Sequence, residues 1–318
     1  MLWSIQTGRS YLLTLMIGVV ASAFLVRLFI LFHDCVHGSL FPQKRVNTVV
    51  GTVLGLLVVT PFEDWRFSHL RHHASYANLD TRGIGDIWTL TRTEYEQASK
   101  GLRIAYWIYR CPFVLVGLGA LVAFLLRYRL PAKKVKRKEW ASVIFTNLII
   151  VLTVLIASQT LGWQTFLLIQ LPLIWMAGTA GIFLFYVQHQ FKGVYWARRE
   201  EWDGLKAALV GTSFYNLPPI LRWFSGSIGF HHIHHLSSRN VFDSPNGRCG
   251  YFTMENILGG SLDKFWNSYG SKMVPIETTV ELVKQVCRGL GWLILHRLLL
   301  FTGTLSLKVF WLVMRQTV

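Results

Sequence analysis

Histidines are concentrated in three short motifs of this 318-residue chain, and their spacing suits metal binding. Nine of the eleven histidines fall within HDCVH, HLRHH and HHIHH. Residues at i, i+3 and i+4 share one face of a helix, so each motif can present two or three imidazoles toward one point. Neutral imidazole is a good ligand for zinc, copper, iron and nickel. The histidines in this register are His33, His37, His69, His72, His73, His231, His234 and His235.

Eight imidazoles are too many for one ion, because a tetrahedral zinc site needs four ligands. The motifs therefore predict two metal ions that share a site. His189, in FYVQHQF, follows the last long apolar run at the depth of the motifs, and we expect it to be a ninth ligand. His232 breaks the register, which leaves it as a ligand or as a hydrogen-bonding group beside one. For the isolated His296, the sequence favours an ordinary solvated or hydrogen-bonded side chain.

Other kinds of redox or hydrolytic site find little support in the sequence. There is no HExxH motif of zinc proteases and no ExxH motif of soluble di-iron carboxylate proteins. RGIGDIW lacks the third glycine of a dinucleotide-binding motif, and the four cysteines form no CxxC pair. A redox metal in this chain must therefore receive its electrons from another protein.

The composition predicts an all-α integral membrane protein. Apolar residues make up 52% of the chain, and its mean hydropathy is +0.39. The runs 11–31, 141–158 and 163–187 are long enough to cross a bilayer, and the last two form a hairpin. The formal charge is +16, but basic residues flank apolar segments, as in 127–139. This placement favours cytoplasmic loops near the membrane over a nucleic-acid interface.

Metal sharing also constrains the topology, because the three motifs must then lie on one face of the membrane. The run 46–60 should be re-entrant or lie on the surface, since a crossing would separate the first two motifs by about 30 Å. The run 112–126 has basic residues on both flanks and should dip in or lie along the interface. We therefore expect about three spans with a cytoplasmic histidine cap. Residues 63–111 and 190–285 should be cytoplasmic, and residues 1–9 should lie outside.

The chain is expected to form one membrane domain over residues 1–285. The tail, 286–318, is apolar but interrupted by charged residues such as Arg288 and Arg297. Such a pattern is typical of a helix that lies in the membrane interface rather than one that spans it.

The order HxxxH, HxxHH, HxxHH resembles the membrane fatty acid desaturases, most closely the bacterial acyl-lipid branch related to delta-12 and omega-6 enzymes. FHDCVHGSLF, HLRHHASYANLDTRGIGDIWTLT, LFYVQHQF and YNLPPILRWFSGSIGFHHIHHLSSR carry the resemblance, which covers residues 20–240. It implies an acyl-lipid substrate, two non-haem irons, O2 as co-substrate and electrons from ferredoxin or a cytochrome b5-type donor. In a bacterium it also implies the cell inner membrane. The implied metal ligands are His33, His37, His69, His72, His73, His189, His231, His234 and His235.

Two other functions remain open at this point. A membrane hydroxylase or alkane monooxygenase uses similar motifs and leaves an alcohol instead of an alkene. A metal transporter would need charged groups along a path through the membrane, and the spans 141–158 and 163–187 carry none. Arg27 is the ionised residue within a predicted span, where it could snorkel to the interface or pair with Asp34.

Overall fold

The computed structural model describes residues 1–83, 85–132 and 135–236, which belong to one compact unit. These residues form helices joined by loops, and apart from two isolated β-bridges they contain no strand pairing. The all-α class predicted from the sequence is confirmed. The predicted tail 286–318, the domain boundary at 285 and His296 lie outside the described residues.

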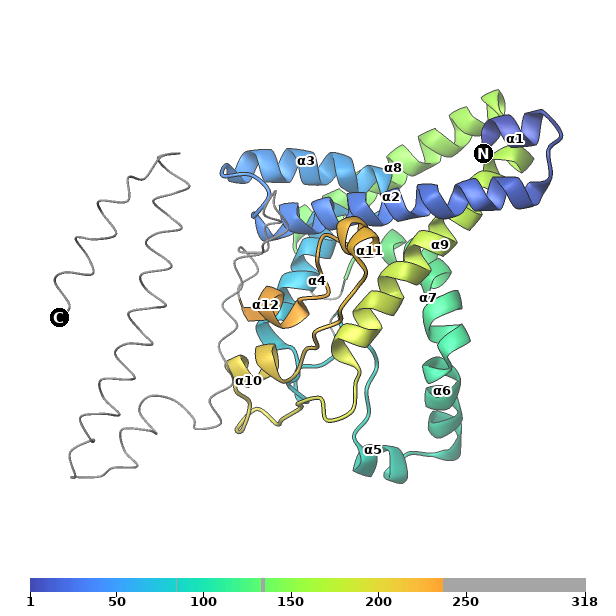
Figure 1. Cartoon of the computed structure of the whole chain (residues 1–318). Coiled ribbons are helices and arrows are strands. Elements are labelled where there is room, and N and C mark those ends of the chain that lie inside the picture. The colour runs from blue at the N-terminus through green and yellow to red at the C-terminus, as the bar shows by residue number, and fades with distance from the viewer. Residues whose placement is uncertain (84, 133–134, 237–318) are drawn as a thin grey trace, which may run out of the picture. The chain divides into compact units, whose positions relative to one another are not determined.

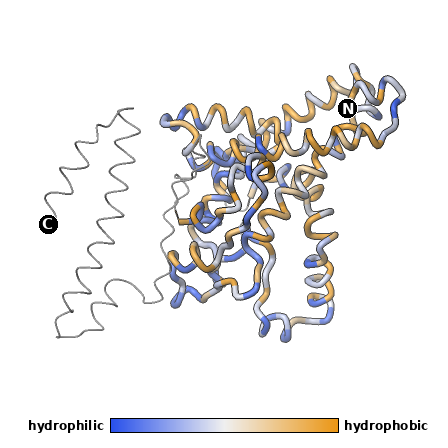
Figure 2. The backbone as a smooth tube through the Cα atoms, viewed as in Figure 1, coloured by the Kyte–Doolittle hydropathy of each residue, from blue (hydrophilic) through white to orange (hydrophobic). Residues whose placement is uncertain are grey.

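Three long helices form the membrane-spanning part of the described chain: α2 (Tyr11–His37), α8 (Arg137–Thr160) and α9 (Trp163–His189). The Ser10 side chain caps the start of α2, which ends at Gly38 in the left-handed conformation (φ +67°). The helices α8 and α9 are joined by a two-residue turn with Gly162 at φ +79°. Hydrophobic residues run along all three helices (Figures 1 and 2). The three predicted spans are confirmed.

The run predicted to be re-entrant forms α3 (Lys44–Leu57), which packs beside α2 and is followed by α4 (Phe62–Ser75) at an angle of 104°. Gly51 lets α3 approach α4 closely, because a Cβ there would lie 2.1 Å from the Phe62 ring. His37, at the end of α2, and His69, within α4, bring their Nε2 atoms to 2.9 Å. The intervening chain thus leaves and returns on one side of the membrane, as a re-entrant hairpin does.

A second bent pair joins α6 (Lys100–Arg110) to the segment Phe113–Arg129 at 68°. That segment consists of π-helical turns η1 (Phe113–Leu118) and η2 (Val122–Leu126) around α7 (Gly119–Leu121), followed by the short 3-10 turn η3 (Arg127–Arg129). It packs on α9, where a Cβ on Gly178 would lie 3.0 Å from Ala120. The Arg110 side chain donates to the Gln190 side chain, next to the end of α9. The Ala132 amide donates to Asp64 in α4, so both ends of the segment Phe113–Arg129 lie near the histidine side.

Short helices complete the described part of the chain. They are α1 (Leu2–Gln6), α5 (Arg92–Gln97), α10 (Gly204–Leu209), α11 (Pro219–Phe224) and α12 (His231–Leu236). A capping box between Thr91 and Glu94 begins α5, and Arg82 forms an ion pair with Glu94 at 2.5 Å. The side-chain hydrogen bond from Arg82 lowers the pKa of Glu94 to about 2. This network fixes the loop between α4 and α6.

Candidate metal centre

Nine imidazoles from four helices meet at one end of the helical bundle. The C-terminal ends of α2 and α9 lie on the same side of the bundle. The helices α4 and α12 cover that side (Figure 1). The helical register of each motif turns its histidines inward, as the spacing predicts. The histidines that meet are His33 and His37 of α2, His69, His72 and His73 of α4, His189 of α9, and His231, His234 and His235 of α12.

The ring nitrogens form two groups that could each hold an ion. His72, His189 and His235 form one group, whose ligand atoms lie within 4.8 Å of one another. His231 adjoins it, with its Nε2 atom 2.9 Å from that of His189. The second group, with ligand atoms equally close, contains His33, His37, His69, His73 and His234.

The distances within each group fit metal coordination better than hydrogen bonding. His69 directs its Nε2 atom at those of both His37 (2.9 Å) and His73 (3.1 Å), although one Nε2 carries either one proton or one lone pair. Two imidazoles bound to one ion at about 2.1 Å and at about 90–110° to each other would hold their nitrogens roughly 3.0–3.4 Å apart. The residues therefore fit metal ions.

Burial favours the neutral form of five of these imidazoles, which is the form that binds metal. Desolvation and the neighbouring histidines lower the pKa values of the buried histidines on α4 and α12 well below the usual 6.5. These are His69, His73, His231, His234 and His235. Buried His235 Nε2 has no hydrogen-bond partner among the described residues. A coordinated ion would satisfy this atom and offset the cost of burying it.

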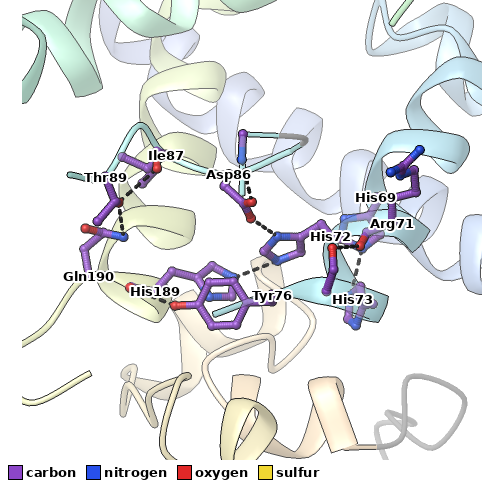
Figure 3. Close-up of polar contacts among 12 residues, drawn as sticks. His69, Arg71, His72, His73, Tyr76, Asp86, Ile87, Thr89, His189 and Gln190 are labelled. Carbon is purple, nitrogen blue, oxygen red and sulfur yellow. Dashed lines mark hydrogen bonds and ion pairs between the residues drawn. The ribbon is translucent and has the colours of Figure 1, made fainter. Parts of the chain in front are cut away.

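Groups around the histidines fix the orientation of their rings (Figure 3). Asp86 accepts a hydrogen bond from Nδ1 of His72 at 2.7 Å, which leaves Nε2 free to face His189 at 3.2 Å. The other carboxylate oxygen of Asp86 accepts from the Gly83 amide at 3.1 Å. A carboxylate behind a histidine is a common arrangement at metal sites. The hydroxyl of Tyr76 donates to the His189 carbonyl at 3.0 Å and holds the end of α9.

Aromatic side chains form the walls of the site and keep water out. The Trp65 ring stacks on His69, with ring centroids 4.3 Å apart and an interplanar angle of 17°. Phe185 lies against both His72 and His189, at 5.4 and 4.7 Å between centroids. A dry site strengthens the interactions of any charge that develops within it.

The histidine motifs predict the nine imidazoles, but they give no role to Asp86. Asp86 follows two glycines in a loop just after the second histidine motif, in a stretch that lacks the dinucleotide-binding pattern and that carries part of the family resemblance. His232 belongs to neither group of ring nitrogens, and its ring lies 6.2 Å from that of Phe214. Its predicted role as a ligand or as a group beside one stays open.

Long lipid-facing helices with a buried cluster of histidines at one membrane boundary define an integral membrane protein with a candidate metal centre. Residues 10–239 match the family model of the fatty acid desaturases, and the chain belongs to this family. The resemblance seen in the motifs of the sequence is thereby confirmed.

Several proteins that are similar to this chain are described as desaturases. The chain is 47% identical to a fatty acid desaturase of Bacillus subtilis (strain 168), over 72% of this chain and 65% of that protein. It is 26% identical to a chloroplastic omega-6 fatty acid desaturase of Glycine max, over 75% of this chain and 56% of the relative. It is also 26% identical to an sn-1 oleoyl-lipid 12-desaturase of Anabaena variabilis, over 82% of this chain and 73% of that protein. The chain thus spans between about half and two thirds of the length of the first two relatives.

Proposed function

We propose that this protein is a membrane-bound acyl-lipid desaturase with two irons in the histidine centre. The observation that carries the proposal is the pair of imidazole groups, buried at the end of the helices that face lipid. Membership of the fatty acid desaturase family and the descriptions of the relatives support the same reaction.

Five histidines of one group would hold the first iron, and the other group together with His231 would hold the second. Iron and O2 would supply the oxidising chemistry that an unactivated methylene needs, because no acid or base can attack such a carbon directly. The protein supplies the geometry: Asp86 fixes the ring of His72, and Trp65 and Phe185 exclude water.

The overall reaction consumes one O2, two electrons and two protons for each double bond. Two adjacent CH2 groups of the acyl chain lose two hydrogens and become CH=CH, and two molecules of water form. The sequence lacks a dinucleotide-binding motif and a cysteine cluster, so we propose that a ferredoxin or a cytochrome b5-type protein delivers the electrons.

We propose that the histidine centre faces the cytoplasm, which in a bacterium means the inner face of the cell inner membrane. The segments on its side of the spans, 38–136 and 190–236, contain 14 and five Lys and Arg residues. Residues 1–10 and 161–162, at the other ends of the spans, contain one, Arg9. Lys and Arg are retained on the cytoplasmic side of membrane proteins. A topology reporter fused at Arg198 should therefore read cytoplasmic, and one at Gly162 should read external.

The experiment that tests the function is the fatty-acid profile of host membranes with and without the expressed chain, together with a ferredoxin and its reductase. New unsaturated acyl chains are expected, and they should be absent with His72→Ala. The variant Arg71→Ala, at an exposed position next to His72 in α4 and outside both groups, serves as the matched control and should retain activity. Hydroxylated acyl chains would support a hydroxylase instead, and an unchanged profile would overturn the proposal.

A further inference from the structure

The segment between α10 and α12 leaves the histidine centre and returns to it. At its start, Ser213 donates to the backbone carbonyls of Val187 and Gln188 at the end of α9. At its end, His231 lies beside His189. The two arms pair with each other, since the Tyr215 amide donates to the Gly229 carbonyl at 2.8 Å. The intervening residues, 216–228, therefore form a closed excursion that contains α11.

This excursion lies alongside the apolar part of a spanning helix. The ring of Phe24, in α2, contacts the rings of Trp223 and Phe224 at centroid distances of 6.2 and 5.2 Å. Phe24 lies seven residues inside the end of the apolar run 11–31, which is about 10 Å at 1.5 Å per residue. α11 thus lies beside the apolar part of α2, inside the end of the run predicted to span the membrane.

Arg27 of α2 holds the excursion in this place. Its guanidinium donates to the Trp223 carbonyl at 2.8 Å and lies over the Trp223 ring, 5.2 Å from the centroid. Gly226, at φ +55°, permits the close approach, because a Cβ there would lie 2.5 Å from Ile30. An arginine within a span is costly unless it finds polar partners, and α11 provides one. This interaction replaces the predicted pairing of Arg27 with Asp34.

The outer surface of the excursion is apolar and exposed. Ile220, Leu221 and Trp223 are 70%, 49% and 50% exposed. The polar head of Arg222 turns back to the segment itself, where it donates to the Asn216 side chain and the Leu217 carbonyl. Exposed apolar side chains with internally paired polar groups suit a lipid environment. The surface is also continuous with α2, whose Phe24 is 50% exposed.

We propose that residues 216–224 insert into the hydrocarbon layer of the leaflet nearest the histidine centre, with lipid acyl chains against Ile220, Leu221 and Trp223, and with Arg27 as the anchor. This inference is independent of the proposed desaturation. Within the described residues, it adds a membrane-inserted stretch to the segment 190–285, which the sequence predicts to be cytoplasmic. Because α12 begins seven residues after α11 ends, the bilayer then helps to position the third histidine motif.

Spin labels test the environment of α11 in the complete chain, reconstituted in phospholipid vesicles. A label at Ile220→Cys is compared with one at Leu152→Cys, on the outer face of α8, and one at Glu200→Cys, in an exposed charged loop. Buried Cys35 is retained in the background, and three other cysteines are replaced by serine: Cys111, Cys249 and Cys287. Collision with O2 reports lipid, and collision with a water-soluble nickel chelate reports the aqueous phase.

The label at Ile220 is expected to show the high O2-to-nickel collision ratio of the Leu152 label. A ratio equal to that of the Glu200 label would place α11 in water and overturn the proposal. Low collision with both reagents would show that protein covers the surface, including the chain beyond residue 236, and would overturn it as well.

The role of Arg27 is tested in the same assay. Arg27→Met removes both the hydrogen bond and the charge, and the label at Ile220 should then shift toward the aqueous ratio. Arg45→Met, at an exposed position near the start of α3, is the matched control and should leave the ratio unchanged. An unchanged ratio with Arg27→Met would show that Arg27 is not the anchor.

Discussion

Replacing Asp86 by Asn should weaken one of the two proposed metal positions and leave the other intact. The carboxylate accepts from Nδ1 of His72 with one oxygen and from the Gly83 amide with the other. Asparagine has a single acceptor oxygen, so its NH2 group must face one of these two donors. One of the two donors then loses its acceptor, and in either orientation the negative charge behind His72 is lost.

The structure sets the size of this effect. The side chains of His72 and Asp86 are only 2% and 5% exposed, so water cannot take the place of the carboxylate behind His72. Leaving a buried donor unpaired costs about 1–3 kcal/mol. Since 1.4 kcal/mol is a tenfold change in a binding constant, this agrees with the roughly 10- to 100-fold loss of affinity seen when the partner of a metal-binding histidine is removed.

Competition with a chelator measures the effect on purified protein. At a chelator concentration that leaves the unaltered protein loaded, Asp86→Asn should retain about one metal ion fewer per chain. Only one ion should be lost, because Asp86 bonds to His72, which belongs to one group, while His33 and His37 belong to the other. Asp80→Asn is the matched control, since Asp80 accepts from the Arg198 side chain and the Arg199 amide away from the histidines. Equal metal retention by Asp86→Asn and the unaltered protein would refute the reasoning.

Three further outcomes are expected. His235→Ala should abolish desaturation but not membrane insertion, because it removes a candidate ligand and leaves the spans unchanged. Gly51→Ala should destabilise the protein by about 1–3 kcal/mol in thermal unfolding, because the new Cβ would overlap the buried Phe62 ring. Arg82→Met should lower the free energy of unfolding at pH 7 by less than about 1 kcal/mol. Since the pKa of Glu94 falls from 4.5 to about 2 in the folded state, this difference should shrink as the pH decreases from 4.5 toward 2.

Each of these predictions has a control and an outcome that would contradict it. Desaturation by His235→Ala would remove that residue from the proposed ligands. Gly101→Ala, in α6 with open space around it, should not destabilise the protein, and an equal loss in both glycine variants would count against the close packing of α3 on α4. For Arg82→Met, the control is Arg92→Met, whose exposed ion pair with Glu96 should contribute little. A pH-independent difference would exclude the assigned role of Glu94.

The spans and the helical register of the histidines could be predicted because they depend on local sequence. The runs that became α2, α8 and α9 are long and apolar, and their length alone identifies them. The i, i+3, i+4 spacing places ligands on one helix face whatever the fold. Even the isolated His189 was predictable, because it ends the last span at the level of the other motifs.

Contacts between segments distant in the sequence could not be predicted. Asp86 reaches His72 through a loop whose path no periodicity specifies. In the sequence, Gly51 is an ordinary glycine within an apolar run. Its close contact with the Phe62 ring is visible only in the structure. The position of α11 depends on a hydrogen bond from Arg27, 196 residues earlier in the chain. For Arg27 the sequence predicts either snorkelling to the interface or pairing with Asp34, because only local pairs can be read from it.

Metal analysis of the purified, iron-loaded protein tests the central claim most directly. Eight imidazoles in two groups, with His231 beside one of them, predict two irons per chain, and Mössbauer spectra should show both in nitrogen-rich sites. Zinc alone at one per chain, or one iron that remains single at saturating iron, would contradict the two-metal centre.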